Sequence, residues 1–261
     1  MSFPGKIDAA GPASLTLYGR GPDTLVCRLG FWSAALTVVF AALHMVVGIL
    51  TPPRAGPFAP PADVIAYPYT DVAAFIPGDY LWIYPGLLLA FVFVVLMACI
   101  HYRASEQRKI FSQIGMSLSL IYATVIIVDY FLQFAVVQPG ILSGEAAGLS
   151  LLTQYNPNGI FIALEGIGYF VMSLALLFAA GSFAGGKLER AIRGVFIAGF
   201  VLAVFSLAVL FMLMQDLVAF EVAILSIDWL VLIISGILLC SLFRRTAGSM
   251  AQETKSGNKI E

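Results

Sequence analysis

Four ionisable side chains stand inside long apolar stretches of this sequence: His44, Asp129, Glu165 and Asp228. A charged side chain at the centre of a membrane helix costs about 2.5–3.5 kcal/mol on insertion scales, so such residues are rare and usually face the interior of a helix bundle. Three carboxyls in a low dielectric cannot all stay ionised without partners. The set could share a proton, bind a divalent cation, or bind a small polar or cationic ligand.

Helical spacing adds two residues to this candidate site. Gln133 lies four residues after Asp129, and Tyr169 lies four residues after Glu165, so each pair shares one helix face. At about 1.5 Å per residue, the four ionisable groups lie about 10–13 Å from the outer ends of their helices. We therefore expect four helices to line one polar pocket that is open toward the outside.

The sequence leaves several functions open for such a pocket. Proton- or cation-linked transport of a small molecule, or binding of one, is the first. A non-catalytic membrane subunit or sensor, whose carboxyls only form hydrogen bonds between helices, is the second. A metal-dependent intramembrane hydrolase, with metal candidates His44, Asp129, Glu165 and Asp228, is the third. The absence of HExxH and GxSxG motifs, with only two histidines in the chain, argues against an enzyme.

No cofactor signature accompanies these residues. The chain has no Walker A motif, no haem-attachment motif and no cysteine pattern for an iron–sulfur cluster. No apolar stretch contains a lysine that could bind retinal. The three cysteines, Cys27, Cys99 and Cys240, are expected near cytoplasmic helix ends as small packing residues.

The elements that must position the site are membrane spans. Residues of the AVILMFWYC set make up 60% of the 261 residues and charged residues only 11%, whereas soluble domains carry about 25% charged residues. Because backbone groups in lipid must pair within their own segment, each apolar run of about 20 residues predicts a helix. The sequence predicts an all-α, six-helix bundle over residues 29–243, with spans at about 29–50, 81–100, 110–137, 159–184, 194–214 and 222–243.

Charge in the loops predicts the orientation. Of the 14 Lys and Arg residues, all but Arg54 fall on one side of the six spans. The positive-inside rule therefore places both termini in the cytoplasm of a cell with a plasma or inner membrane. Segments 1–28 and 244–261 are polar and are expected to be disordered cytoplasmic ends. The near balance between 14 basic and 15 acidic residues argues against a nucleic-acid partner.

The first predicted outer loop, Thr51–Asp79, holds seven of the 13 prolines and is followed by several aromatic residues. Proline density makes such a loop stiff and extended. It fits either an interfacial aromatic belt or a cap over an outward-facing cavity. Small residues such as Gly194 and Ala198 mark close helix contacts, which are compatible with a homodimer or a membrane partner subunit.

Three stretches resemble a set of uncharacterised prokaryotic six-helix membrane proteins: LWIYPGLLLAFVFVVLMACIHY, RKIFSQIGMSLSLIYATVIIVDYFLQFAVVQPG and LLTQYNPNGIFIALEGIGYFVMSLALLF. The resemblance runs from about Asp79 to Arg245. It implies a prokaryotic inner membrane and the same topology. It implies no activity, cofactor or site residue.

Overall fold

The computed structural model describes residues 24–145 and 148–257, and within these ranges the chain forms helices and no strand. The prediction of an all-α protein with six spans is confirmed, because six helices are long and apolar enough to cross a membrane. The main helices are α1 (Thr24–Leu50), α2 (Ile83–Arg103), α3 (Lys109–Leu132), α4 (Gln138–Leu142), α5 (Ile160–Ala180), α6 (Lys187–Ser206) and α7 (Leu217–Gly257).

Two of the six spans contain a wider helical segment near one end. The π-helix η5 (Gln133–Val137) joins α3 to α4, and the π-helix η7 (Leu207–Leu213) continues α6. Short 3-10 turns occupy the connections: η1 (Gly56–Phe58), η2 (Thr70–Phe75), η3 (Gly78–Tyr80), η4 (Glu106–Arg108) and η6 (Leu149–Leu151). Pro85 falls in the first turn of α2, where its missing N–H has no helical partner to lose.

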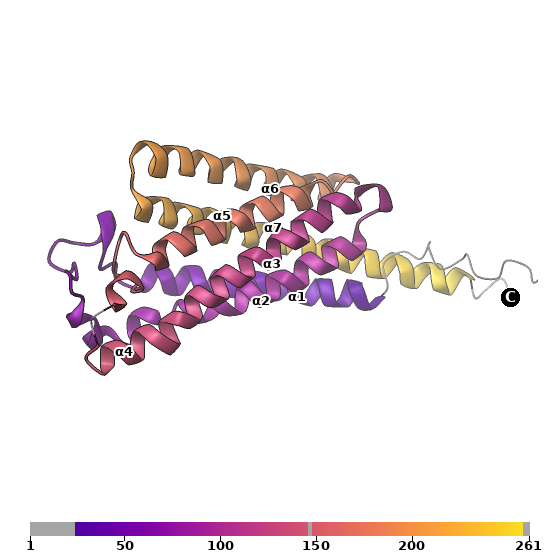
Figure 1. Ribbon diagram of the computed structural model, residues 1–261. Coiled ribbons are helices and arrows are strands. Elements are labelled where there is room, and N and C mark those ends of the chain that lie inside the picture. Colours follow the sequence, from indigo (N-terminus) through magenta and orange to yellow (C-terminus); the bar gives the residue numbers. More distant parts are fainter. Residues whose placement is uncertain (1–23, 146–147, 258–261) are drawn as a thin grey trace, which may run out of the picture.

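The helices form one elongated bundle (Figure 1). Helix α1 packs against α2 and α7, and α3 packs against α2 and α5, while α6 lies outside and touches mainly α5 and α7. The outer surface is apolar along the bundle, as a lipid-facing surface requires. This protein is therefore a multi-pass membrane protein.

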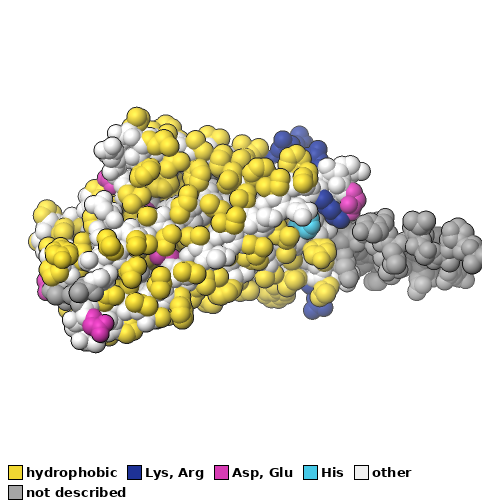
Figure 2. Space-filling model, viewed as in Figure 1, with side chains coloured by type: hydrophobic (Ala, Val, Ile, Leu, Met, Phe, Trp, Pro, Cys, Tyr) yellow, Lys and Arg dark blue, Asp and Glu magenta, His cyan; other side chains and the backbone are white. Residues whose placement is uncertain are grey.

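The two ends of the bundle differ in charge. We call the end where α1 ends and α7 begins the pocket end, and the opposite end the basic end. Figure 2 shows Lys and Arg side chains gathered near the basic end, on the side of the C-terminus. Arg54 is the exception at the pocket end. From this distribution, the positive-inside rule predicts that the pocket end faces outward.

The last helix differs from the prediction at both ends. Helix α7 begins at Leu217 rather than at residue 222, and it continues to Gly257. The described part of the expected disordered tail, 244–257, is thus helical, because extending an existing helix avoids the cost of nucleation. At the other terminus, residues 24–28 already belong to α1. Residues 1–23 and 258–261, which belong to the expected disordered ends, lie outside the described residues.

Candidate functional site

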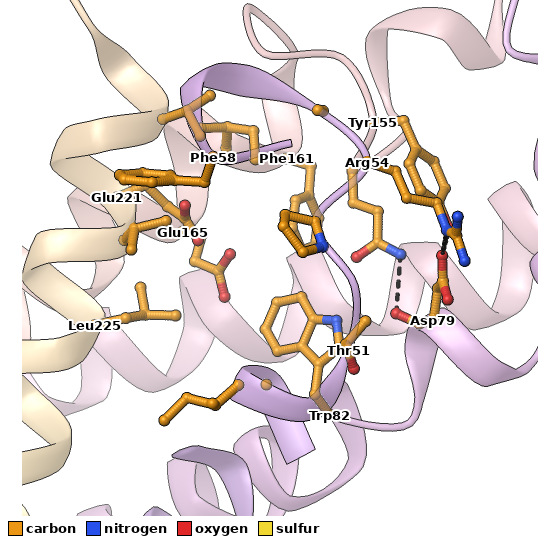
Figure 3. Close-up of a pocket in the computed structure, with 18 of the residues that line it drawn as sticks. Thr51, Arg54, Phe58, Asp79, Trp82, Tyr155, Phe161, Glu165, Glu221 and Leu225 are labelled. Atoms are coloured by element: carbon orange, nitrogen blue, oxygen red, sulfur yellow. Dashed lines mark hydrogen bonds and ion pairs between the residues drawn. The ribbon is translucent and has the colours of Figure 1, made fainter. Parts of the chain in front are cut away.

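A cavity of about 550 Å³ lies at the pocket end, between the C-terminus of α1 and the N-terminal turns of α5 and α7 (Figure 3). The first loop covers it, since residues 51–55, Phe58 and Asp79 belong to its lining. The proline-rich loop thus contributes to a cavity wall, and we call its lining part the cap. The other lining residues are Gly48, Ile49, Trp82, Gln154, Tyr155, Phe161, Ile162, Glu165, Val218, Glu221, Val222, Leu225, Ser226 and Trp229.

An ion pair and two hydrogen bonds anchor this cap at Asp79. Arg54 Nε donates to Asp79 Oδ2 at 2.5 Å, and Tyr155 Oη donates to the same oxygen at 3.0 Å. Gln154 Nε2 donates to the Asp79 carbonyl oxygen at 3.2 Å. The Arg54 guanidinium also lies 3.6 Å above the ring of Phe75. Among the described residues, Arg54 is the only basic one in the cavity lining, and Asp79 neutralises it.

Burial governs the ionisation of Tyr155 in this anchor. Its side chain is only 4% exposed. Burial, the neighbouring Tyr80 and the negative charge of Asp79 all raise the pKa of Tyr155 above its ordinary value. Tyr155 therefore remains a hydrogen-bond donor to Asp79 at every physiological pH.

Two carboxyls from facing helices form the acidic wall of the cavity. Glu165 lies in the second turn of α5 and is fully buried, and Glu221 lies in the first turns of α7 and is 7% exposed. Both side chains point into the cavity, near one another (Figure 3), and they interact electrostatically. No lining residue supplies a free positive charge to balance them.

Aromatic rings form much of the remaining wall. Trp82, Tyr155, Phe161 and Trp229 line the cavity, together with Phe58 from the cap. The faces of such rings carry partial negative charge and attract cations, most strongly quaternary and other organic ammonium groups. A wall of rings and carboxyls is therefore suited to a small organic cation.

A chain of buried hydroxyls begins behind Glu165. Tyr130 Oη donates a short hydrogen bond to Glu165 Oε1 and lies 3.1 Å from Tyr169 Oη. Tyr169 Oη lies 3.4 Å from His44 Nδ1, which also accepts a hydrogen bond from Trp229 Nε1 at 3.1 Å. The structure thus connects three of the predicted site residues, His44, Glu165 and Tyr169.

Aromatic rings enclose His44. Its imidazole stacks on Trp82, with 5.4 Å between centroids and 5° between planes, and meets Trp229 edge-on at 5.2 Å. Tyr130 and Tyr169 lie at 6.3 Å and 6.2 Å. His44 has no solvent exposure. Trp82 and Trp229 therefore separate it from the cavity that they also line.

The other three predicted site residues form no hydrogen bond with this chain. Asp228 is fully buried, and its Oδ1 accepts a hydrogen bond from Ser173 at 2.7 Å. Ser173 follows Glu165 by eight residues on α5, which places Asp228 about 12 Å deeper along the bundle. Gln133 Nε2 donates to the Leu152 carbonyl at 2.8 Å.

Asp129 is buried, and its Oδ2 has no partner among the described residues. It does not line the cavity, although it interacts electrostatically with Glu165 and Glu221. Of the four ionisable groups only Glu165 lines the cavity, so they do not line the single open pocket that the sequence predicts. The reason is geometric for Asp228, because α7 begins five residues earlier than expected and carries Asp228 further from the pocket end.

The described residues also bring no three His, Cys, Asp or Glu side chains close enough to hold a metal ion together. The metal candidates His44, Asp129, Glu165 and Asp228 are thus not gathered into one coordination site.

Four further residues of this region are absent from the predicted site: Tyr130, Glu221, Trp82 and Trp229. Glu221 lies one residue before the predicted span at 222–243, and its spacing of seven residues from Asp228, which puts both on one helix face, is the signal that points to it. Tyr130 directly follows Asp129, but nothing in its apolar surroundings separates a buried tyrosine from an interfacial one. Trp82 and Trp229 fit an interfacial belt equally well.

Comparisons with known protein families, with curated proteins and with solved structures give no match to this chain, so its function is argued from the site alone.

Proposed function

We propose that this protein binds a small organic cation in the cavity and carries it across the membrane in exchange for protons. The observation that carries the proposal is the pair of carboxyls, Glu165 and Glu221, in a cavity whose one basic residue is already paired. Two neighbouring carboxyls without a counterion must bind either protons or a cation. Protons and ligand then compete for the same oxygens, and this competition links the two fluxes.

Size and shape support a small-molecule ligand. The volume of about 550 Å³ falls within the range of about 300–1,000 Å³ that is typical of ligand pockets. The ammonium group would lie against Glu165 and Glu221, and an apolar part would lie against Phe161 and Leu225. Ring faces and carboxyls favour a charged amine over its neutral analogue.

The position of the cavity supports a carrier. It lies at one end of the bundle, and the rings of Trp82 and Trp229 close it toward the buried residues beneath. Carriers hold their substrate at a site that reaches one side of the membrane at a time. A sensor or partner subunit would use the same binding site, but it would not move the cation.

The test uses benzylammonium as the probe and benzyl alcohol as its neutral analogue. Because Trp82 and Trp229 line the cavity, tryptophan fluorescence of the detergent-purified protein should report binding. We expect benzylammonium to bind more tightly than benzyl alcohol. Glu165→Gln or Glu221→Gln should weaken it about tenfold or more, because a hydrogen bond to a charged group contributes about 1.5–3 kcal/mol.

The matched control is Glu106→Gln, which removes an exposed carboxyl that pairs with Lys109 at the basic end. It should leave binding unchanged. Equal affinities for the amine and the alcohol, or unchanged binding in both pocket variants, would refute the binding site. Proteoliposomes then test transport: a pH gradient should drive benzylammonium uptake, and binding without any uptake would leave a sensor or subunit as the function.

A further inference from the structure

We propose that His44 is a second proton-binding site, and that a relay of two tyrosine hydroxyls, Tyr130 and Tyr169, connects it to Glu165 in the cavity wall. The relay is continuous in the structure, from Glu165 Oε1 through both hydroxyls to His44 Nδ1. It lies behind the cavity lining, which includes Glu165 but none of the other three residues. The proposal does not depend on which ligand the cavity binds.

The hydrogen bonds of the relay can point in two directions. Each tyrosine hydroxyl can donate one hydrogen bond. When Glu165 is ionised, Tyr130 must donate to it and Tyr169 donates to Tyr130, so no proton points at His44. When Glu165 is protonated, it can donate to Tyr130, and Tyr130 to Tyr169. Tyr169 can then donate to His44 Nδ1, where it competes with Trp229 Nε1 for the single lone pair. A proton that arrives at Glu165 therefore reverses the hydrogen bonds along the chain.

The same chain can transfer the proton. The O–H bond at Glu165 breaks, each hydroxyl accepts one proton and releases its own, and an N–H bond forms at His44 Nδ1. One proton moves, Glu165 becomes a carboxylate, and His44 becomes an imidazolium. No other reactant is needed.

One neighbour of His44 can stabilise an imidazolium. The stacked face of Trp82 lies 5.4 Å from the imidazole between centroids, within the range of a cation–π interaction. Among the described elements that pack against His44, α3 presents Tyr130 and α5 presents Tyr169, with Glu165 behind it. Helix α7 carries Asp228 beside Trp229, and the N-terminus of α2 presents Trp82, which does not titrate.

Protonation of His44 would act back on the cavity. Trp229 Nε1 can only donate, and at present it donates to the Nδ1 lone pair. A proton on Nδ1 removes this acceptor, so the indole of Trp229 must find another position. Because Trp229 lines the cavity, the proton on His44 and the shape of the ligand site are linked.

The chain offers a direct test, because it contains only two histidines, His44 and His101. Protein labelled with ¹⁵N-histidine gives two sets of imidazole signals, and His101→Gln assigns them. We expect neutral His44 to carry its proton on Nε2, since Nδ1 accepts hydrogen bonds. In a titration from about pH 5 to about pH 8 without added ligand, the ¹⁵N chemical shift of His44 Nδ1 should change as Glu165 becomes protonated or ionised.

Tyr130→Phe and Tyr169→Phe remove the hydroxyls and keep the rings. Each should therefore abolish the pH-dependent change in the His44 Nδ1 chemical shift. Glu165→Gln should hold the Nδ1 signal at one position. The matched control is Tyr80→Phe, which removes a buried hydroxyl outside the relay and should respond as wild type does.

Three results would overturn the proposal: a proton on Nδ1 of neutral His44, no pH response in wild type, or an unaltered response in either relay variant. The wild-type tautomer and pH response test it even if a variant fails to fold. No ligand is used, so a failure of amine binding is a separate outcome.

Discussion

The close approach of Gly86 to the rings around His44 leads to a prediction about stability. A Cβ at this position in α2 would lie 2.7 Å from Tyr130 Cε2 and 2.9 Å from His44 Cε1. Ordinary carbon contacts begin at 3.4 Å, so the Tyr130 ring would have to retreat by about 0.7 Å to reach an ordinary contact. The ring is held by its hydrogen bond to Glu165 and by Trp82 and Phe161, so it cannot move freely.

The size of the effect follows from two opposed contributions. Overpacking a rigid core costs about 1–3 kcal/mol, and replacing glycine by alanine in a helix recovers about 0.5–1 kcal/mol. Gly86→Ala should therefore destabilise the protein by about 1–2 kcal/mol, which lowers Tm by roughly 2–8 °C for a chain of this size. At Gly194 in α6, no described atom lies within 4 Å of an added Cβ. Gly194→Ala should thus be neutral or slightly stabilising.

Thermal unfolding of both variants in one detergent measures the difference. The Gly86→Ala protein should also show displaced His44 imidazole signals, because its Cβ meets that ring directly. Equal Tm values for the two variants, with the His44 signals unmoved, would refute the tight packing of Gly86, Tyr130 and His44 on which this prediction rests.

Two further predictions concern the cap and the topology. Tyr155→Phe should cost about 1–2 kcal/mol at neutral pH, because it removes a buried hydrogen bond to Asp79. Since burial raises the pKa of Tyr155, its contribution to stability is complete below about pH 10 and is lost as the pH rises further. The variant should therefore lose less stability than wild type in an alkaline unfolding series, and parallel curves would contradict this. In a background without native cysteines, a cysteine at residue 62 should react with an impermeant external reagent and one at residue 105 should not. The reverse labelling pattern would invert the predicted orientation.

Apolar run length was enough to predict the six spans, because the bilayer imposes both a length and a helical backbone. The depth of side chains was harder to predict, because it depends on where each helix begins. Glu221 shows this most clearly. Because α7 begins five residues earlier than predicted, Glu221 lies within the helix and its side chain lines the cavity.

Contacts between helices could not be predicted from the sequence either. Spacing placed Tyr169 on the face of Glu165, which is a local relation within one helix. The pairing of Glu165 with Tyr130, and of His44 with Trp229, depends on which helices become neighbours and how they rotate. Gln133, four residues after Asp129, contacts the second loop at the Leu152 carbonyl rather than the cavity.

The two π-helices, η5 and η7, give the bundle ends different mechanical properties. Both occur where their spans reach the pocket end. A π-turn has poorer hydrogen-bond geometry than an α-turn, and it can convert to an α-turn by moving one residue out of register. The basic end has regular α-helices there, and the Arg103–Glu189 ion pair joins α2 to α6. If the cavity opens and closes, we therefore expect the helices to move at the pocket end, where the π-turns interrupt the α-helical hydrogen bonding.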